Sequence, residues 1–223
     1  MTFSVAGVCP DTGMVGCAIT SSSICVASRC TFVRSGIGVA LTQNVTNPDL
    51  GPLALDLMSD KLPTAEVMQA LETLDDNIQW RQLGLLNLAG DSATFSGSEA
   101  LGLYATAAGK NCIAMGNLLE NTAVPQAMIN SFENSSGHLA ERLLQALEAG
   151  LAAGGELGPI QSAGLLVAAE PNWPIVNLRV DWHIEPINEL RMIWGNYQPQ
   201  MDAYITRAKA PANADSYGVP GDE

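Results

Sequence analysis

Short apolar runs joined by tight turns are the feature that most constrains this fold. The runs Phe3–Cys9 and Met14–Thr20 flank 10-PDTG-13, a turn sequence that favours a β-hairpin. The runs Gln82–Leu88 and Ala93–Gly97 are separated by a second turn of this kind. Because hairpins join neighbouring strands antiparallel, the sequence predicts largely antiparallel sheets rather than a strict alternation of parallel strands and helices.

Helical periodicity appears in segments that come in pairs. In 139-LAERLLQALEAGLAA-153 a leucine recurs every four residues, and Gly154-Gly155 is a typical stop. Asn47 and Pro48 suit the N-cap and first position of a helix that reaches Ser59. Two further helices are predicted at residues 64–74 and 122–132, and a last helix is predicted to begin near residue 186. Further strands are predicted at residues 37–43, 111–116, 161–169 and 176–183.

Paired helices beside hairpins indicate helical layers that cover sheet faces. We find no internal repeat and no linker, so the sequence predicts one domain over residues 1–209. The segment 210-APANADSYGVPGDE-223 is small, polar and acidic, and we expect it to be a flexible tail.

Charge and hydropathy exclude several classes of function. Ten Lys and Arg against 23 Asp and Glu give a net charge of −13, which disfavours nucleic-acid binding. Apolar stretches such as 163-AGLLVAA-169 are far shorter than the ~20 residues of a membrane span. The first residues carry no basic and apolar signal pattern, and the five cysteines are an odd number. We therefore expect a cytoplasmic protein with reduced thiols and no membrane partner.

Familiar catalytic motifs are missing from the sequence. It contains no GxSxG, GxxxxGK[ST], GxGxxG or HExxH pattern, and its two histidines are too few for a typical zinc site. His138 precedes the leucine-patterned helix, where a capping or surface role is usual, and His183 ends a predicted strand. The sequence therefore predicts neither a metal nor a cofactor.

Thr2 offers chemistry that needs no histidine. Removal of Met1 is favoured by a small following residue, and it would leave a hydroxyl and a free α-amine on the same residue. The amine has an ordinary pKa of ~7.7–8.0, so a useful fraction is neutral and can accept the hydroxyl proton. The apolar strand that starts at Phe3 would hold this residue rigidly. We expect Thr2 to be an N-terminal nucleophile.

A set of stretches carries a resemblance to a known family: 2-TFSVAG-7, 15-VGCAITSSS-23, 36-GIGVALTQNVTNPDLG-51, 81-RQLG-84, 115-MGNLL-119, 139-LAERLLQALEAGLAAGG-155 and 161-QSAGLLV-167. Together they resemble an uncharacterised bacterial family with an N-terminal-nucleophile (Ntn) hydrolase-like fold, the domain of unknown function 1028, over about residues 1–190. The resemblance implies an α+β, Ntn-hydrolase-like, four-layer αββα sandwich with largely antiparallel sheets.

Analogy with this fold suggests which residues meet Thr2. Asn44 would stabilise an oxyanion, Arg29 would lower the pKa of the nucleophile, and Glu156 would set the charge around the amine. Two of these residues also have a structural interpretation: Asn44 in a turn and Arg29 in a surface ion pair. Substrate contacts are assigned to Ser22, Ser23, Gln43, Asn117, Gln161 and Ser162. Of these, Asn117 could instead cap a helix, and Ser162 could bond to backbone.

The resulting hypothesis is an Ntn-type amidohydrolase that cleaves a small-molecule amide, ureide or imide C–N bond through a Thr2 acyl-enzyme. An alternative is a catalytically silent Ntn-like scaffold that binds a small ligand or a partner protein. A third is a cysteine hydrolase that uses Cys25 or Cys30. Aromatic residues near the last helix, Trp194, Tyr197 and Tyr204, are expected to be exposed, and a homodimer is the default expectation.

Overall fold

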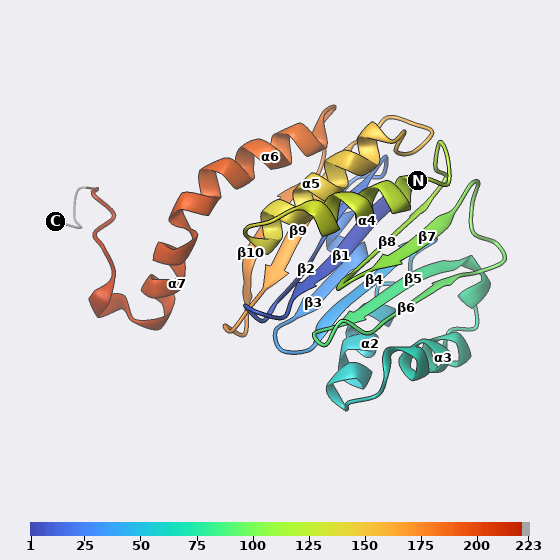
Figure 1. Cartoon of the computed structure of the whole chain (residues 1–223), viewed down its shortest axis with the longest axis horizontal. Helices are drawn as coiled ribbons and strands as arrows, with labels where there is room; N and C mark the ends of the chain where they lie inside the picture. The colour runs from blue at the N-terminus through green and yellow to red at the C-terminus, as the bar shows by residue number, and fades with distance from the viewer. Residues whose placement is uncertain (220–223) are drawn as a thin grey trace.

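The strands form two antiparallel sheets in the computed structural model, which describes residues 1–219 (Figure 1). The larger sheet has the order β10-β9-β2-β1-β8-β7, with β1 Thr2–Cys9, β2 Met14–Ser21, β7 Ala105–Gly109, β8 Cys112–Asn117, β9 Ser162–Ala168 and β10 Pro174–Val180. The smaller sheet has the order β3-β4-β5-β6, with β3 Thr31–Arg34, β4 Gly38–Asn44, β5 Arg81–Asn87 and β6 Ser92–Ser96.

Helices cover the outer face of each sheet (Figure 1). The larger sheet is covered by α4 Val124–Asn134, α5 Leu139–Ala152 and α6 Pro186–Tyr197. The smaller sheet is covered by α2 Leu50–Ser59 and α3 Thr64–Leu74. The remaining helices are α1 Ala27–Cys30, α7 Met201–Lys209 and the short 3-10 turns Ile78–Trp80, Gln198–Gln200 and Pro211–Asn213.

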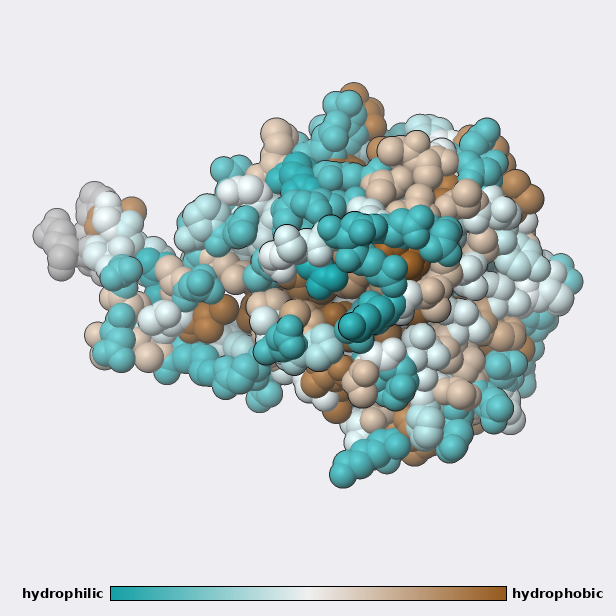
Figure 2. All heavy atoms as spheres, in the orientation of Figure 1, coloured by the Kyte–Doolittle hydropathy of each residue, from teal (hydrophilic) through white to brown (hydrophobic). Residues whose placement is uncertain are grey.

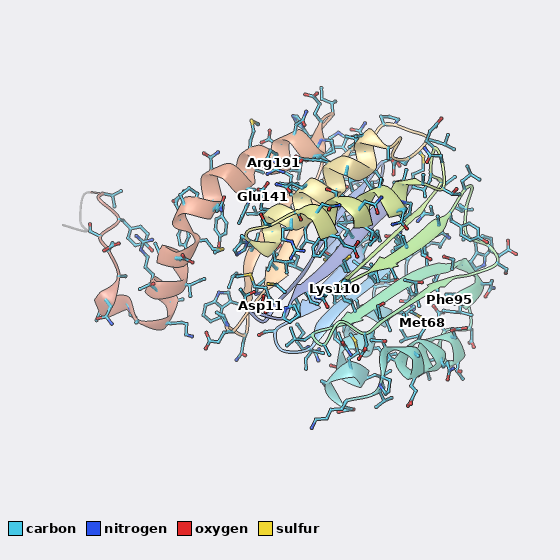
Figure 3. The ribbon with its side chains drawn as sticks, in the orientation of Figure 1. Asp11, Met68, Phe95, Lys110, Glu141 and Arg191 are labelled. Carbon is cyan, nitrogen blue, oxygen red and sulfur yellow. The ribbon has the colours of Figure 1, made fainter. Side chains whose placement is uncertain are left out.

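Three apolar cores separate these four layers. One lies between the larger sheet and α4, α5 and α6, and includes Phe3, Phe132 and Leu147. A second lies between the two sheets, and a third lies between the smaller sheet and α2 and α3. Figure 3 shows Met68 of α3 and Phe95 of β6 in the third core. The predicted four-layer αββα sandwich with largely antiparallel sheets is therefore confirmed.

Strand β1 runs through the middle of the larger sheet, and its side chains alternate between two cores. Phe3 and Val5 pack in the core under the helices, whereas Ala6 and Val8 pack between the sheets. The alternation places Thr2 and Ser4 on the face of β1 that looks toward the smaller sheet. This face of the sandwich, at the start of β1, holds the candidate site.

Several elements differ from the sequence prediction. Helix α1 and strands β3 and β7 were not predicted, because they are short or, as in 105-ATAAG-109, made of small residues without an apolar alternation. Helix α2 begins at Leu50, two residues later than expected. Asn47 does not cap it directly: its Oδ1 accepts the Asp49 N–H at 3.2 Å, inside the preceding turn.

Helix α6 is fixed on α5 by a cluster of charges. The Arg191 guanidinium donates to Glu141 Oε1 at 2.7 Å and to Glu148 Oε1 at 2.8 Å, and Figure 3 shows Arg191 and Glu141 between the two helices. The indole N–H of Trp194 donates to Glu141 Oε2 at 2.9 Å. Trp194 is only 1% exposed, so the expectation of an exposed residue is wrong there, while Tyr197 is half-buried and Tyr204 is exposed.

The surface is dominated by polar residues where the helices face outward. Figure 2 shows hydrophilic residues gathered over the middle of the face formed by α4 and α5, with hydrophobic residues scattered around it. Within residues 1–219, no helix combines the length and the apolar character that crossing a bilayer requires. Residues 211–219 are mostly exposed and start with a 3-10 turn, and residues 220–223 of the expected tail lie outside the described residues.

Candidate functional site

A row of polar residues lies across the end of the larger sheet. Thr2 of β1 pairs with Asn117 of β8 on one side and with Ser21 of β2 on the other, and Ser21 pairs with Ser162 of β9. Directly paired residues in a sheet present their side chains on the same face. All four are buried, and Thr2 is the most exposed of them at 6%. The strand order thus brings together four polar side chains that are far apart in sequence.

A second polar row on the smaller sheet faces the first. Gln43 of β4 pairs with Gln82 of β5, which pairs with Ser96 of β6. Gln43 joins the two sheets, because its Oε1 accepts the Ser4 hydroxyl at 2.7 Å. Gln82 Oε1 accepts the side-chain amides of Gln43 at 2.8 Å and Asn117 at 3.1 Å. A buried network of amides and hydroxyls therefore holds the side chain of Asn117, the residue that pairs with Thr2.

Gln82 is the centre of this network, and its loss has a predictable cost. We expect Gln82→Ala to lower the free energy of unfolding by about 3 kcal/mol. The substitution leaves buried polar groups of Gln43, Asn117 and Gly116 without the hydrogen bonds that they form with the Gln82 side chain. Urea unfolding measures the change. The matched variant Gln69→Ala, on the exposed face of α3, should cost less than about 0.5 kcal/mol. Equal effects in the two variants would contradict the network.

The Thr2 hydroxyl points at the carbonyl group that precedes it. Its Oγ1 donates to the Met1 carbonyl oxygen at 2.5 Å and lies 3.1 Å from Ser21 Oγ. Ser21 Oγ also donates to the Met1 carbonyl oxygen. Two hydroxyls thus converge on one carbonyl group, and a Ser21 hydroxyl in this position can stabilise negative charge on a carbonyl oxygen that Thr2 attacks. Met1 itself is half-buried.

Glu156 is a buried carboxyl group in the segment that follows α5. It forms an isolated bridge with Leu119, just beyond the strand end that carries Asn117, and it is 6% exposed. Neither of its carboxyl oxygens has a hydrogen-bond partner. Burial raises the pKa of Glu156 to about 7, while the charge of the Met1 ammonium group and the nearby Ser22 act in the opposite direction. Glu156 therefore changes charge near neutral pH.

This pKa predicts how stability depends on pH. The pKa in the folded chain lies above the ordinary value of 4.5, so the folded state binds the proton more tightly than the unfolded state. Protonated Glu156 therefore contributes to the free energy of unfolding. This contribution is fully present below about pH 4.5, decreases as the pH rises toward 7, and is lost above pH 7. Glu156→Gln removes this decrease. We expect its stability relative to wild type to grow by on the order of 3 kcal/mol between about pH 4 and pH 8.

Thermal unfolding across that pH range measures this difference. Glu120→Gln is the control, because Glu120 is an exposed neighbouring carboxyl group. Its stability relative to wild type should stay constant with pH. A constant difference for Glu156→Gln as well would contradict the raised pKa.

Other residues singled out from the sequence lie elsewhere or bond to backbone. The Asn44 amide donates to Trp80 O at 2.6 Å and its Oδ1 accepts from Leu101 N at 3.1 Å, on the face of β4 that looks away from Thr2. Arg29 donates to Ile24 O at 2.7 Å and to Cys25 O at 3.2 Å, so it holds the loop after β2.

The loops beside the polar row contain the remaining candidates. Ser162 Oγ donates to Ser23 O at 2.6 Å and accepts from Val26 N at 3.1 Å, which fixes the loop after β2. The backbone N–H of Gln161 donates to Ser21 O at 2.8 Å. Ser22 lies near Glu156, and Ser23 is exposed. Asn117 does not cap a helix, since α4 starts at Val124 with Ala123 as its N-cap residue.

The cysteines and histidines serve other purposes. Burial raises the pKa of Cys30 to about 11, which leaves a neutral thiol at physiological pH, and Cys25 is half-buried with φ of 56°. His138 caps α5, where its Nδ1 accepts the Ala140 N–H at 3.2 Å. His183 Nδ1 accepts the Glu185 N–H at 3.1 Å. Within residues 1–219, no three His, Cys, Asp or Glu side chains gather as a metal site.

Three site residues, Ser4, Ser21 and Gln82, were not assigned to the site from the sequence. Ser4 and Gln82 are both fully buried in the polar network. A signal was present for Gln82: Gln43 and Gln82 each interrupt an otherwise apolar strand near one end. Nothing in the sequence, however, indicates that these two ends pair with one another.

Comparisons with known proteins place this architecture in a family. A family model described as "Family of unknown function (DUF1028)" matches residues 2–190. The crystal structure of protein SPO2555 from Silicibacter pomeroyi, labelled with the same family, is 29% identical with a TM-score of 0.83 and covers 88% of this chain and 86% of that chain. Comparison with curated proteins finds no match.

A more distant structure also aligns along most of the chain. Anbu (ancestral beta-subunit) from Yersinia bercovieri is 11% identical with a TM-score of 0.38, and the alignment covers 91% of this chain and 97% of that chain. Similarity at this level carries no information about function.

Proposed function

The chain belongs to the DUF1028 family, whose function is unknown, and we propose from its own site that it is an Ntn-type amidohydrolase. Its substrate is a small molecule with an amide, ureide or imide C–N bond. Thr2 is the nucleophile, and its α-amine becomes available when Met1 is removed. The observation that carries the proposal is the convergence of the Thr2 and Ser21 hydroxyls on the Met1 carbonyl oxygen.

The first half of the reaction forms an acyl-enzyme. The neutral Thr2 amine accepts the hydroxyl proton as Oγ1 attacks the substrate carbonyl carbon. The Ser21 hydroxyl, which donates to the Met1 carbonyl oxygen, stabilises the oxyanion in place of the expected Asn44. The C–N bond then breaks, and the ammonium of Thr2 returns the proton to the leaving nitrogen. Water attacks the resulting ester in the same way and releases the acid.

Neighbouring residues adjust the amine and hold the row in place. Asn117 Oδ1 is buried without a partner beside Thr2, and it accepts a hydrogen bond from the freed amine. Glu156 sets the charge around the amine, as expected from the sequence. Gln43 and Gln82 support Asn117 and Ser4 from the other sheet. Arg29 and Ser162 act indirectly, by fixing the loop between Ser21 and Val26.

A panel of chromogenic anilides, ureides and imides tests this proposal on chain that begins at Thr2. Release of the leaving amine or urea with turnover supports it. The second candidate, a catalytically silent scaffold, is favoured by the 6% exposure of Thr2 beneath Met1. Tight binding of panel compounds without any turnover would favour the scaffold.

A further inference from the structure

Met1 is half-buried next to Thr2, and its carbonyl oxygen and its side chain contact two different parts of the site. Its carbonyl oxygen accepts from the hydroxyls of Thr2 and Ser21. Its side chain lies against Gly158, since a Cβ placed on that glycine would be 2.8 Å from Met1 Cε and 3.3 Å from Sδ. The ammonium group that Met1 carries here lowers the pKa of Glu156 through its charge, but it forms no hydrogen bond with either carboxyl oxygen. The site therefore holds an aminoacyl group in this structure.

The buried Glu156 carboxyl group has no basic side chain as a partner within residues 1–219. A carboxylate that loses water without gaining hydrogen bonds is costly to bury, so such groups are normally paired. Within residues 1–219, Glu156 forms no ion pair and both its oxygens lack partners. Arg29 of α1, the basic residue expected near the site, is bonded instead to the Ile24 and Cys25 carbonyl oxygens. An ammonium group on a bound ligand would supply this partner.

The wall beside Met1 leaves room for an extended side chain. Gly158 has no positive φ, so its backbone does not require glycine, and the missing side chain is what leaves space for the Met1 thioether. A methionine side chain is unbranched and apolar. The same space accepts a linear alkyl chain of similar length.

We propose that the space occupied by Met1 is the acyl site for substrate, and that it accepts an L-α-aminoacyl group with an unbranched apolar side chain. The substrate ammonium binds Glu156, its carbonyl oxygen binds the Ser21 hydroxyl, and its side chain lies against Gly158. The assignment rests on the proposed hydrolase function and narrows its substrates to aminoacyl amides.

Two anilides that differ by one group test the ammonium site. Chain that begins at Thr2 is assayed with L-norleucine 4-nitroanilide and with hexanoyl 4-nitroanilide, which has the same carbon chain without the amine. We expect kcat/KM to be at least about tenfold higher for the norleucine compound, since the hexanoyl compound leaves the buried Glu156 carboxylate without an ammonium partner. Glu156→Gln should bring the two substrates close to equality, and the exposed control Glu120→Gln should keep the preference.

Outcomes for the aminoacyl site and for the hydrolase proposal are separable. Equal hydrolysis of both anilides by the wild type would overturn the aminoacyl site and leave the hydrolase intact. Binding of L-norleucinamide and hexanamide is also measured by NMR on a Thr2→Ala chain without Met1. Preferential binding of norleucinamide that Glu156→Gln removes supports the site even where no anilide is cleaved, and equal binding overturns it.

Gly158 gives an independent test of the side-chain site. We expect Gly158→Val to reduce kcat/KM for L-norleucine 4-nitroanilide by about tenfold or more relative to L-alanine 4-nitroanilide, because the added methyl groups occupy the space of the Met1 Cε atom. Gly195→Ala on α6 is the control, since a Cβ there meets nothing within 4 Å. An unchanged ratio in Gly158→Val would overturn the placement of the side chain.

Discussion

Thr2→Ala is expected to lower kcat/KM for amide hydrolysis by about 10³-fold or more, because it removes the atom that forms the acyl-enzyme. The α-amine and the β1 backbone remain in place. Stability should change little: the lost hydroxyl bonds only to Met1 O and Ser21 Oγ, at the first residue of the strand. Steady-state kinetics and a thermal melt on the same preparation measure both quantities.

Thr2→Ser is the matched control for this variant. It keeps a hydroxyl and an amine on the same residue, so it should retain measurable turnover and form an acyl-enzyme. Full activity in Thr2→Ala, with the melting temperature of the wild type, would show that another group is the nucleophile.

Retention of Met1 is also expected to lower kcat/KM for amide hydrolysis strongly. An amide nitrogen at Thr2 cannot accept a proton, and general base catalysis by a positioned group contributes about 10²–10⁴-fold. Met1 also occupies the space that the substrate needs. We therefore expect chain that begins at Met1 to be at least about 10²-fold less active than chain that begins at Thr2, in the same assay.

Acetylation of the Thr2 amine separates the two causes. The acetyl group blocks the base but is smaller than a methionine residue. If the loss of the base dominates, the acetylated chain is as inactive as the chain with Met1. Activity of the acetylated chain close to that of the free-amine chain would contradict the role of the amine.

The layered fold was predictable because its signals are local. Helix α3 has the predicted bounds Thr64–Leu74, and the hairpin of β1 and β2 follows from the turn at residues 10–13. These elements have strong apolar periodicity and recognisable turn residues. Strand β7 was missed because 105-ATAAG-109 carries no such pattern, and its pairing with β8 is a tertiary feature. The order of strands across the larger sheet was not predictable from local signals either.

The site was predictable only as a set of single residues. Thr2, Asn117 and Ser162 were identified at strand ends, and the structure aligns them in one row through Ser21. Asn44 was also at a strand end, but the strand alternation turns its side chain to the other face, toward Trp80 and Leu101. Glu156 was identified from its position, while its burial without a partner depends on how the loop after α5 packs on Leu119.

Covalent labelling of the terminal residue tests the central claim most directly. Native protein is treated with a β-lactone, a probe that acylates an activated hydroxyl by ring opening, and its intact mass and labelled peptide are determined by mass spectrometry. We predict a chain that begins at Thr2 and gains the mass of one lactone on that residue, whereas Thr2→Ala gains none. A chain that keeps Met1, or a label that falls on Cys25 or elsewhere while Thr2 stays unmodified, would contradict the account.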